Sequence, residues 1–196
     1  MLIPVDIPDA LPVTVADART YCRAPGEEDN AVIERAVRSA IEYVQDYASV
    51  TLGRSIWHQT FPSWRSCLEI ETSPVRDVLS IGYVDDQGAD QVVDPSQYRT
   101  TITPTGAVVR FTSAFSSPAT NADEDLPITV EFAAGYDLPG ETGSGDDPRL
   151  KLPARAETAV LYLTRLFYDH RTAESPEQLF PIETVTNLLH QLKVYR

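Results

Sequence analysis

The sequence contains few of the residues that hold a fold together by covalent bonds or metal ions. Its 196 residues include two cysteines, Cys22 and Cys67, and three histidines. The cysteines lack a CxxC spacing, which argues against a cysteine-based zinc site and a disulfide framework. No apolar run approaches the roughly 20 residues of a membrane span, and the N-terminus lacks the basic and apolar regions of a signal peptide. We therefore expect two buried free cysteines in a protein made in the cytoplasm, with no membrane partner.

Positive charge is also scarce. The chain has 16 Lys and Arg against 29 Asp and Glu, for a net charge of −13. Residues 111–148 carry eight acidic residues and no Lys or Arg, whereas residues 149–196 carry five acidic and seven basic residues. Phosphate binding requires clustered cations, so this balance argues against a dedicated nucleic-acid-binding protein. An acidic surface would instead repel DNA at short range.

Catalytic motifs are missing as well. The sequence has no GxSxG or HExxH motif, and the glycines of 140–145 lack the Lys-Ser/Thr of a phosphate loop. Asp169 and His170 could form a dyad, but an exposed helix end is favoured, because a cation there suits the helix dipole. A divalent cation could be held by acidic residues without EF-hand spacing, although exposed loops are favoured; these are Asp123, Glu124, Asp125, Asp146 and Asp147. We assign no catalytic residue, metal or cofactor, and a small hydrolase or metal enzyme is the less favoured interpretation.

The first 54 residues predict an extended arm and two helices. Three prolines in residues 1–12 favour an extended arm, which we place at 1–13. Thr14 and Asp17 have the spacing of a capping box and predict a short helix that ends near Arg23. Acidic residues 27–29 then begin a long helix that Gly53 ends. Its apolar positions recur at helical spacing and form one stripe: Ile33, Val37, Ala40, Ile41, Val44 and Ala48.

From residue 55 to residue 136 the apolar pattern changes to that of strands. Short β-rich segments are separated by turn residues such as those of 85–88, which predicts hairpins. The segments are 56–61, 67–70, 78–84, 91–93, 98–102, 108–111 and 128–132. Trp57 and Trp64 belong either to the core of this β-block or to an exposed contact surface, and the core is favoured. Residues 137–152 are rich in Gly, Pro and Asp and predict an exposed acidic loop.

The C-terminal part predicts two more helices. Pro153 opens a helix that continues to near Arg171, and its apolar residues surround most of its girth. Leu161, Tyr162 and Leu166 lie off its main apolar face, so this helix is sandwiched either inside the core or between subunits. The segment 181–196 contains an amphipathic stripe that either docks on its own domain or binds a partner; the stripe and the chain end comprise Val185, Leu188, Leu189, Leu192, Val194, Tyr195 and Arg196.

These elements predict an α+β fold in one domain over residues 1–196. Two long helices and short terminal helices form a small bundle. A mostly antiparallel β-block of about six short strands, residues 55–136, is inserted between them.

Several short sequence segments, taken together with their order and spacing, resemble those of the phage head–tail connector (adaptor) family, whose members are also described as DNA-packaging proteins. They span nearly the whole chain and are 13–19, 31–54, 74–88, 94–98, 130–136, 153–156 with Tyr168 and Arg171, and 188–189 with 195–196. The Val130-Glu131-Phe132-Ala133-Ala134-Gly135-Tyr136 phrase is the most specific. The chain departs from the family in its long 137–152 loop and in Gln191-Leu192-Lys193, where a tighter proline turn is expected.

The resemblance implies a structural virion protein in the neck, between the capsid portal and the tail. Such adaptors form a ring, commonly of twelve copies, which extends the DNA channel and docks the next stopper or tail protein. The C-terminal segment would contact the portal, and DNA would pass without specific binding. From the residues alone we add Leu161, Tyr162, Leu166, Trp57 and Trp64 as candidate subunit contacts, and the five acidic residues above as channel or loop candidates. A stopper or tail-completion subunit is the alternative.

Overall fold

The computed structural model describes residues 1–7, 9–139, 149–170, 183–190 and 192–193. The chain divides into two compact units. One comprises residues 1–8 with 54–135, and the other comprises residues 9–53 with 136–196. Each unit has its own hydrophobic core. The α+β fold class expected from the sequence is confirmed, with helices in one unit and antiparallel sheets in the other.

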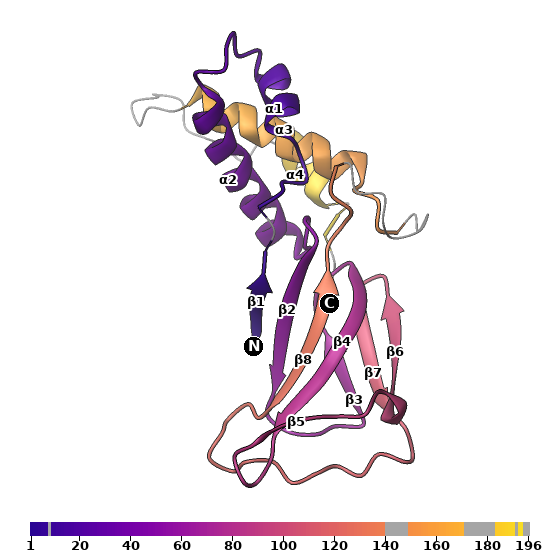
Figure 1. Cartoon of the computed structure of the whole chain (residues 1–196). Coiled ribbons are helices and arrows are strands. Elements are labelled where there is room, and N and C mark those ends of the chain that lie inside the picture. The colour runs from indigo at the N-terminus through magenta and orange to yellow at the C-terminus, as the bar shows by residue number, and fades with distance from the viewer. Residues whose placement is uncertain (8, 140–148, 171–182, 191, 194–196) are drawn as a thin grey trace. The chain divides into compact units, whose positions relative to one another are not determined.

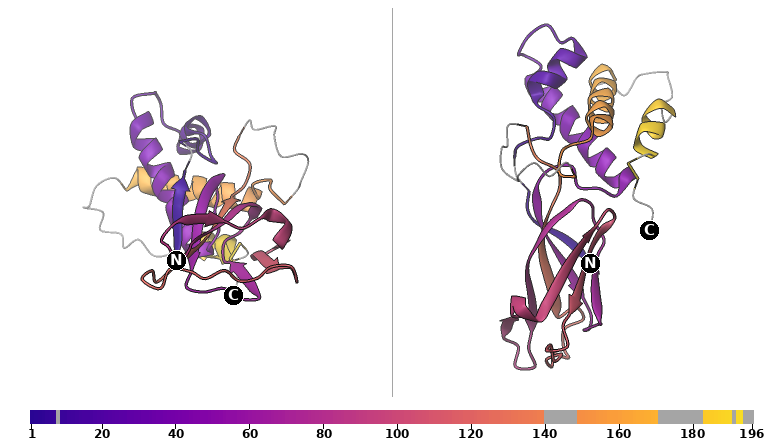
Figure 2. Two further views of the ribbon diagram at one scale, coloured as in Figure 1. Left: turned by 60° about the horizontal axis from the view of Figure 1, so that its bottom comes forward. Right: turned by 90° about the vertical axis from the view of Figure 1, so that its right-hand side faces the viewer.

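The strand unit is a two-layer sandwich (Figures 1 and 2). One sheet has the order β1-β2-β8-β4-β5 and the other has the order β3-β7-β6. The strands are β1 (Leu2–Asp6), β2 (Ser55–Phe61), β3 (Cys67–Ile70), β4 (Val75–Val84), β5 (Asp90–Val92), β6 (Tyr98–Thr103), β7 (Gly106–Phe111) and β8 (Ile128–Ala134), with a 3-10 turn η1 (Pro95–Gln97) before β6. The predicted hairpin at 85–88 joins β4 to β5.

Apolar side chains that alternate along the strands fill the space between the two sheets. Phe132 and Val130 of β8 are fully buried, as are Leu68 of β3 and Val109 of β7. In this sandwich, residues i and i+2 of a strand lie on one face, so the remaining positions of each strand point outward. Both sheets therefore share one core and have opposite outer faces.

The N-terminal arm was predicted to be merely extended, but it forms a strand of the larger sheet. β1 pairs antiparallel with β2, with Leu2 opposite Gln59 and Ile3 opposite His58. All five residues of β1 are exposed. The sequence signal was hidden because prolines argue against a central strand, although they are tolerated in an edge strand such as β1.

The helical unit contains α1 (Val15–Cys22), α2 (Asn30–Ala48), α3 (Ala154–Asp169) and α4 (Glu183–His190). Helix α1 begins as predicted, because the Asp17 backbone N–H donates to Thr14 Oγ1 over 3.1 Å. The capping box differs in one respect: the Thr14 hydroxyl donates to the Asp17 carboxylate, over 2.5 Å. The buried stripe of α2 contains all six of the predicted apolar residues.

Helix α2 ends earlier than predicted. The sequence placed its end at Gly53, but the helix stops at Ala48 and Ser49 takes the left-handed conformation with φ of 56°. Residues 50–52 are buried in an extended segment, in which the Leu52 N–H donates to Gln45 Oε1. The Leu52 carbonyl accepts from the Tyr136 N–H. The chain leaves the helix early because this segment pairs with the strand exit at Tyr136.

Helix α3 contacts α1, α2 and α4 (Figure 1). Its most buried side chains, among them Ala156, Ala159, Val160 and Leu163, face the core of the helical unit. Leu161, Tyr162 and Leu166 are partly buried and pack against the same core. Packing within one chain therefore covers much of the apolar surface around this helix.

Candidate interaction surfaces

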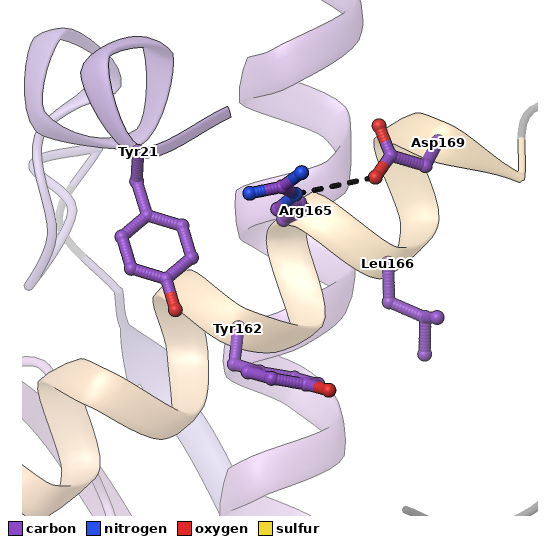
Figure 3. Close-up of a pocket in the computed structure, with 5 residues that line it drawn as sticks. All are labelled: Tyr21, Tyr162, Arg165, Leu166 and Asp169. Carbon is purple, nitrogen blue, oxygen red and sulfur yellow. Dashed lines mark hydrogen bonds and ion pairs between the residues drawn. The ribbon is translucent and has the colours of Figure 1, made fainter. Parts of the chain in front are cut away.

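A pocket of about 280 Å³ lies on the helical unit between α1 and α3 (Figure 3). Helix α3 contributes Tyr162, Arg165, Leu166 and Asp169, and α1 contributes Tyr21. The α3 residues are spaced at i, i+3, i+4 and i+7, which places them on one face of the helix. The sequence singled out Tyr162 and Leu166, and the structure brings both into this pocket. The sequence did not single out Tyr21 or Arg165. Tyr21 reaches the pocket from α1, and Arg165 lies on the same face of α3 as Tyr162 and Leu166.

The pocket is lined by two tyrosines and a leucine together with one ion pair. Arg165 Nε donates to Asp169 Oδ2 over 3.3 Å, and both side chains are nearly half exposed. An exposed pair of this kind contributes only about 0.3–0.5 kcal/mol. Burial raises the pKa of the adjacent Cys22 thiol, and the Asp169 carboxylate raises it further. Tyrosine and arginine are enriched where proteins bind one another, so this pocket suits a protein contact.

Asp169 and His170, the candidate dyad, lie at the end of α3. Asp169 binds Arg165, and the His170 backbone N–H donates to the Leu166 carbonyl. Within the ranges given above, no three His, Cys, Asp or Glu side chains gather in a way that could hold a metal ion. The acidic residues Asp123, Glu124 and Asp125 are exposed in the segment between β7 and β8, and Asp146 and Asp147 lie outside the described residues. Among the helices described, none is long and apolar enough to span a membrane.

Two residues of the long acidic segment are anchored rather than exposed. Leu138 and Leu150 are buried, and the Asp137 N–H donates to the Leu150 carbonyl over 2.7 Å. This hydrogen bond joins the two ends of the 137–152 segment to each other.

The C-terminal stripe divides into buried and partly exposed positions. Val185 and Leu189 of α4 are buried in the core of the helical unit. Leu188 is partly exposed, and Leu192, just after the helix, packs partly buried against the same core. Val194, Tyr195 and Arg196 lie outside the described residues. The alternative that α4 docks on its own domain thus has direct support, while the exposed part of the stripe stays available to a partner.

The tryptophans lie on the rim of the sandwich core. Trp57 is partly buried and its Nε1 donates to Ser55 Oγ over 2.8 Å. Trp64 Nε1 donates to the Pro118 carbonyl, and its ring meets Tyr83, Phe111 and Phe115 edge-on at 5.1–5.5 Å. The favoured interpretation placed these rings in the core. Their burial fits it, and a contact role remains a prediction.

The outer faces of the sandwich carry charges that the sequence analysis missed. On the larger sheet, the polar residues that the cross-strand register places outward include six near its middle and its β5 edge: His58, Thr60, Ser80, Asp90, Thr129 and Glu131. We call this the acidic face. On the smaller sheet, the outward positions include Cys67, Glu69, Arg99, Thr101, Val108 and Arg110, and we call these six the arginine face. Alternation along each strand was the available signal, but only the register shows which residues lie together.

Glu131 is the centre of the acidic face. The Ser80 hydroxyl donates to Glu131 Oε2 over 3.2 Å, and His58 Nε2 lies 3.8 Å from the same oxygen. On the arginine face, Arg99 lies directly opposite Arg110 on the neighbouring strand, and both are exposed. Like charges directly opposite each other are unfavourable in an isolated sheet.

No protein-family model matches the sequence, and no curated protein matches it. The fold, however, matches chains in solved structures over its whole length. A chain from the neck of an empty GTA particle, computed with C6 symmetry, has a TM-score of 0.77 at 19% identity. Chains from the virion of a native gene transfer agent (GTA) particle and from the neck of a native GTA particle, computed with C12 symmetry, have TM-scores of 0.75 and 0.73, each at 20% identity. Each match covers 100% of this chain and 96% of the other chain. At these identities the likeness concerns the fold.

Proposed function

We propose that the chain is a structural subunit of the neck of a phage-like particle, and that within the neck it is the adaptor that forms a ring beneath the portal. The observation that carries the proposal is the full-length likeness to chains in gene transfer agent necks, with a TM-score of 0.77. The match covers 100% of this chain and 96% of the other, so it includes both compact units and is not limited to a single common motif.

The charge of the chain supports a channel role. A net charge of −13 leaves little to attract phosphates, so DNA could slide past the subunit without being held. The exposed acidic residues 123–125 would contribute to such a surface, as the sequence analysis expected. The ring would then position its neighbours and guide DNA rather than carry out chemistry.

Two surfaces of the helical unit fit contacts with other neck proteins. The first is the pocket of Tyr21, Tyr162 and Arg165. The second is the C-terminal stripe, where Leu188 and Leu192 are partly exposed and the chain continues to Arg196. We assign the stripe to the portal and leave the pocket to the partner on the tail side.

Purified particles from the organism that encodes the chain provide the test. We expect mass spectrometry to detect the protein in the particles, and electron microscopy of the neck to place it as a closed ring against the portal. A ring separated from the portal by another protein would instead assign the stopper role. Particles that lack the protein would refute a neck function altogether.

A further inference from the structure

We propose that copies of this chain bind one another front to back, with the acidic face of one sandwich against the arginine face of the next. The inference rests on the proposed ring and names the surfaces that would hold it together. A closed ring of identical subunits requires two different, mutually complementary surfaces on each copy. Because the two sheets share a core, their outer faces lie on opposite sides of the sandwich and meet this geometric requirement.

The charges of the two faces are complementary. The acidic face carries Asp90 and Glu131, and none of its six residues is Lys or Arg. The arginine face carries Arg99 and Arg110, with Glu69 as its only acidic member. In a chain with 29 acidic and 16 basic side chains, two arginines gathered on one small sheet stand out. Carboxylates from a neighbouring copy would neutralise them.

The arginine pair is also locally unfavourable without a partner. Directly opposed like charges destabilise a sheet, and neither guanidinium forms an ion pair within the described residues. Glu69 lies opposite Val108, the outward residue next to Arg110 on β7, and does not form an ion pair with Arg110. A carboxylate of the next copy, placed between Arg99 and Arg110, would remove this repulsion.

The short side chains at the middle of the acidic face suit contact with another sheet. Thr60 and Thr129 lie opposite each other, and Thr129 is in turn opposite Gly82. These short side chains leave Glu131 accessible in the middle of the face, with about a third of its side chain exposed. Val92, on the edge strand β5 and opposite Gly82, is 71% exposed and would gain an apolar contact.

Reciprocal charge reversal tests the contact. Variant A carries Arg99→Glu and Arg110→Glu, and variant B carries Asp90→Arg and Glu131→Lys. Each variant alone has two faces of like charge, so we expect its self-association at low ionic strength to weaken roughly tenfold or more, measured by analytical ultracentrifugation. Mixing A with B recreates complementary pairs at both kinds of junction, so the mixture should associate in alternating chains. If the mixture associates no better than either variant alone, the proposal is overturned.

Thiol cross-linking captures even transient contacts and provides an independent test. Cys67 already lies on the arginine face, opposite Arg110, and Cys22 is buried in the other unit. Adding Thr129→Cys puts a second thiol on the acidic face, and a short bismaleimide should then produce a ladder beyond the dimer. The matched control, Thr101→Cys, adds its thiol to the arginine face and should give no ladder. Monomers alone from Thr129→Cys, Thr60→Cys and Ser80→Cys would refute the contact.

Two controls complete the charge-reversal test. If Glu131→Lys lowers the melting temperature of variant B, a variant with Asp90→Arg and Thr60→Lys replaces it in the mixing experiment, because it places cations on the same face and leaves Glu131 intact. If the wild type binds DNA and variant A does not, the arginines serve nucleic acid and the proposal is wrong. Failure of either test leaves the neck assignment standing, because only particles that lack the protein would refute that assignment.

Discussion

Replacing Leu189 with alanine tests whether helix α4 belongs to the core of the helical unit. Leu189 has no exposed surface, and it lies one turn after the buried Val185. Truncation to alanine removes three carbons, worth about 2.4 kcal/mol at ~0.8 kcal/mol each, and leaves a cavity. We expect a total loss of about 3–4 kcal/mol in the free energy of unfolding.

Thermal unfolding followed by far-UV circular dichroism measures this loss. For a unit of this size, 3–4 kcal/mol corresponds to a melting temperature lower by roughly 10 °C or more. The matched control is Leu188→Ala, in the same helix. Leu188 is partly exposed, so its truncation should cost less than about 1.5 kcal/mol.

Binding to the portal separates the two positions in the opposite sense. Under the proposed function, Leu188→Ala should weaken portal binding while leaving the fold intact. Deleting residues 194–196 should act in the same way, because it leaves Val185 and Leu189 in place. An unchanged melting temperature for Leu189→Ala would contradict the packing of α4 and would return the whole stripe to a partner.

Other predictions concern the two cores. A thiol reagent should modify Cys67 well before Cys22, because Cys22 is buried and burial raises its pKa above the ordinary 9.0; equal rates would contradict this. Burial likewise raises the pKa of Tyr136 above 10.0. Both groups hold their protons more tightly in the folded protein, so their contributions to the free energy of unfolding should be fully present below pH 9.0 and be lost as the pH rises past 9.0 and then 10.0. Denaturant titrations across this pH range check the decline, which Cys22→Ser with Tyr136→Phe should flatten. Gly106→Ala should unfold the sandwich at lower denaturant, since φ is +153° and a Cβ would lie 2.0 Å from the Ile70 carbonyl oxygen; an unchanged midpoint would refute the clash.

Much of the fold could be predicted because local patterns and packing agree. The start of α1 needed only Thr14 and Asp17, and the stripe of α2 needed only its 3.6-residue period. The seven predicted strand segments each lie in a strand of the structure, apart from the last residue of one, Val93. Here alternation, turn residues and burial all favour the same answer.

The errors came from contacts between distant parts of the sequence. Ser49 has no local reason to end α2, and the helix stops there because the next residues pair with Tyr136. Residues 2–6 contain a proline and no clear alternation, so only the edge of β2 makes them a strand. Neither partner can be identified from a local window of the sequence.

The candidate surfaces were predictable only in part, for the same reason. Tyr162 and Leu166 could be selected from a helix that is apolar on many sides. Arg99 and Arg110 are eleven residues apart in the sequence, and only the β6–β7 register makes them neighbours. Charge placed by register has no local signature.

The acidic composition and the arginine pair have related consequences for assembly. A subunit with a net charge of −13 repels its own copies as well as DNA, so a ring needs local attraction that overcomes this repulsion. Salt should therefore have two opposing effects, because it screens both the general repulsion and the pairing of Arg99 and Arg110 with the next copy. If the faces pair as proposed, added salt should weaken wild-type association but strengthen that of variant A, in which only repulsion remains. Sedimentation across a salt series checks this crossover, and parallel responses of the two proteins would exclude the charge pairing.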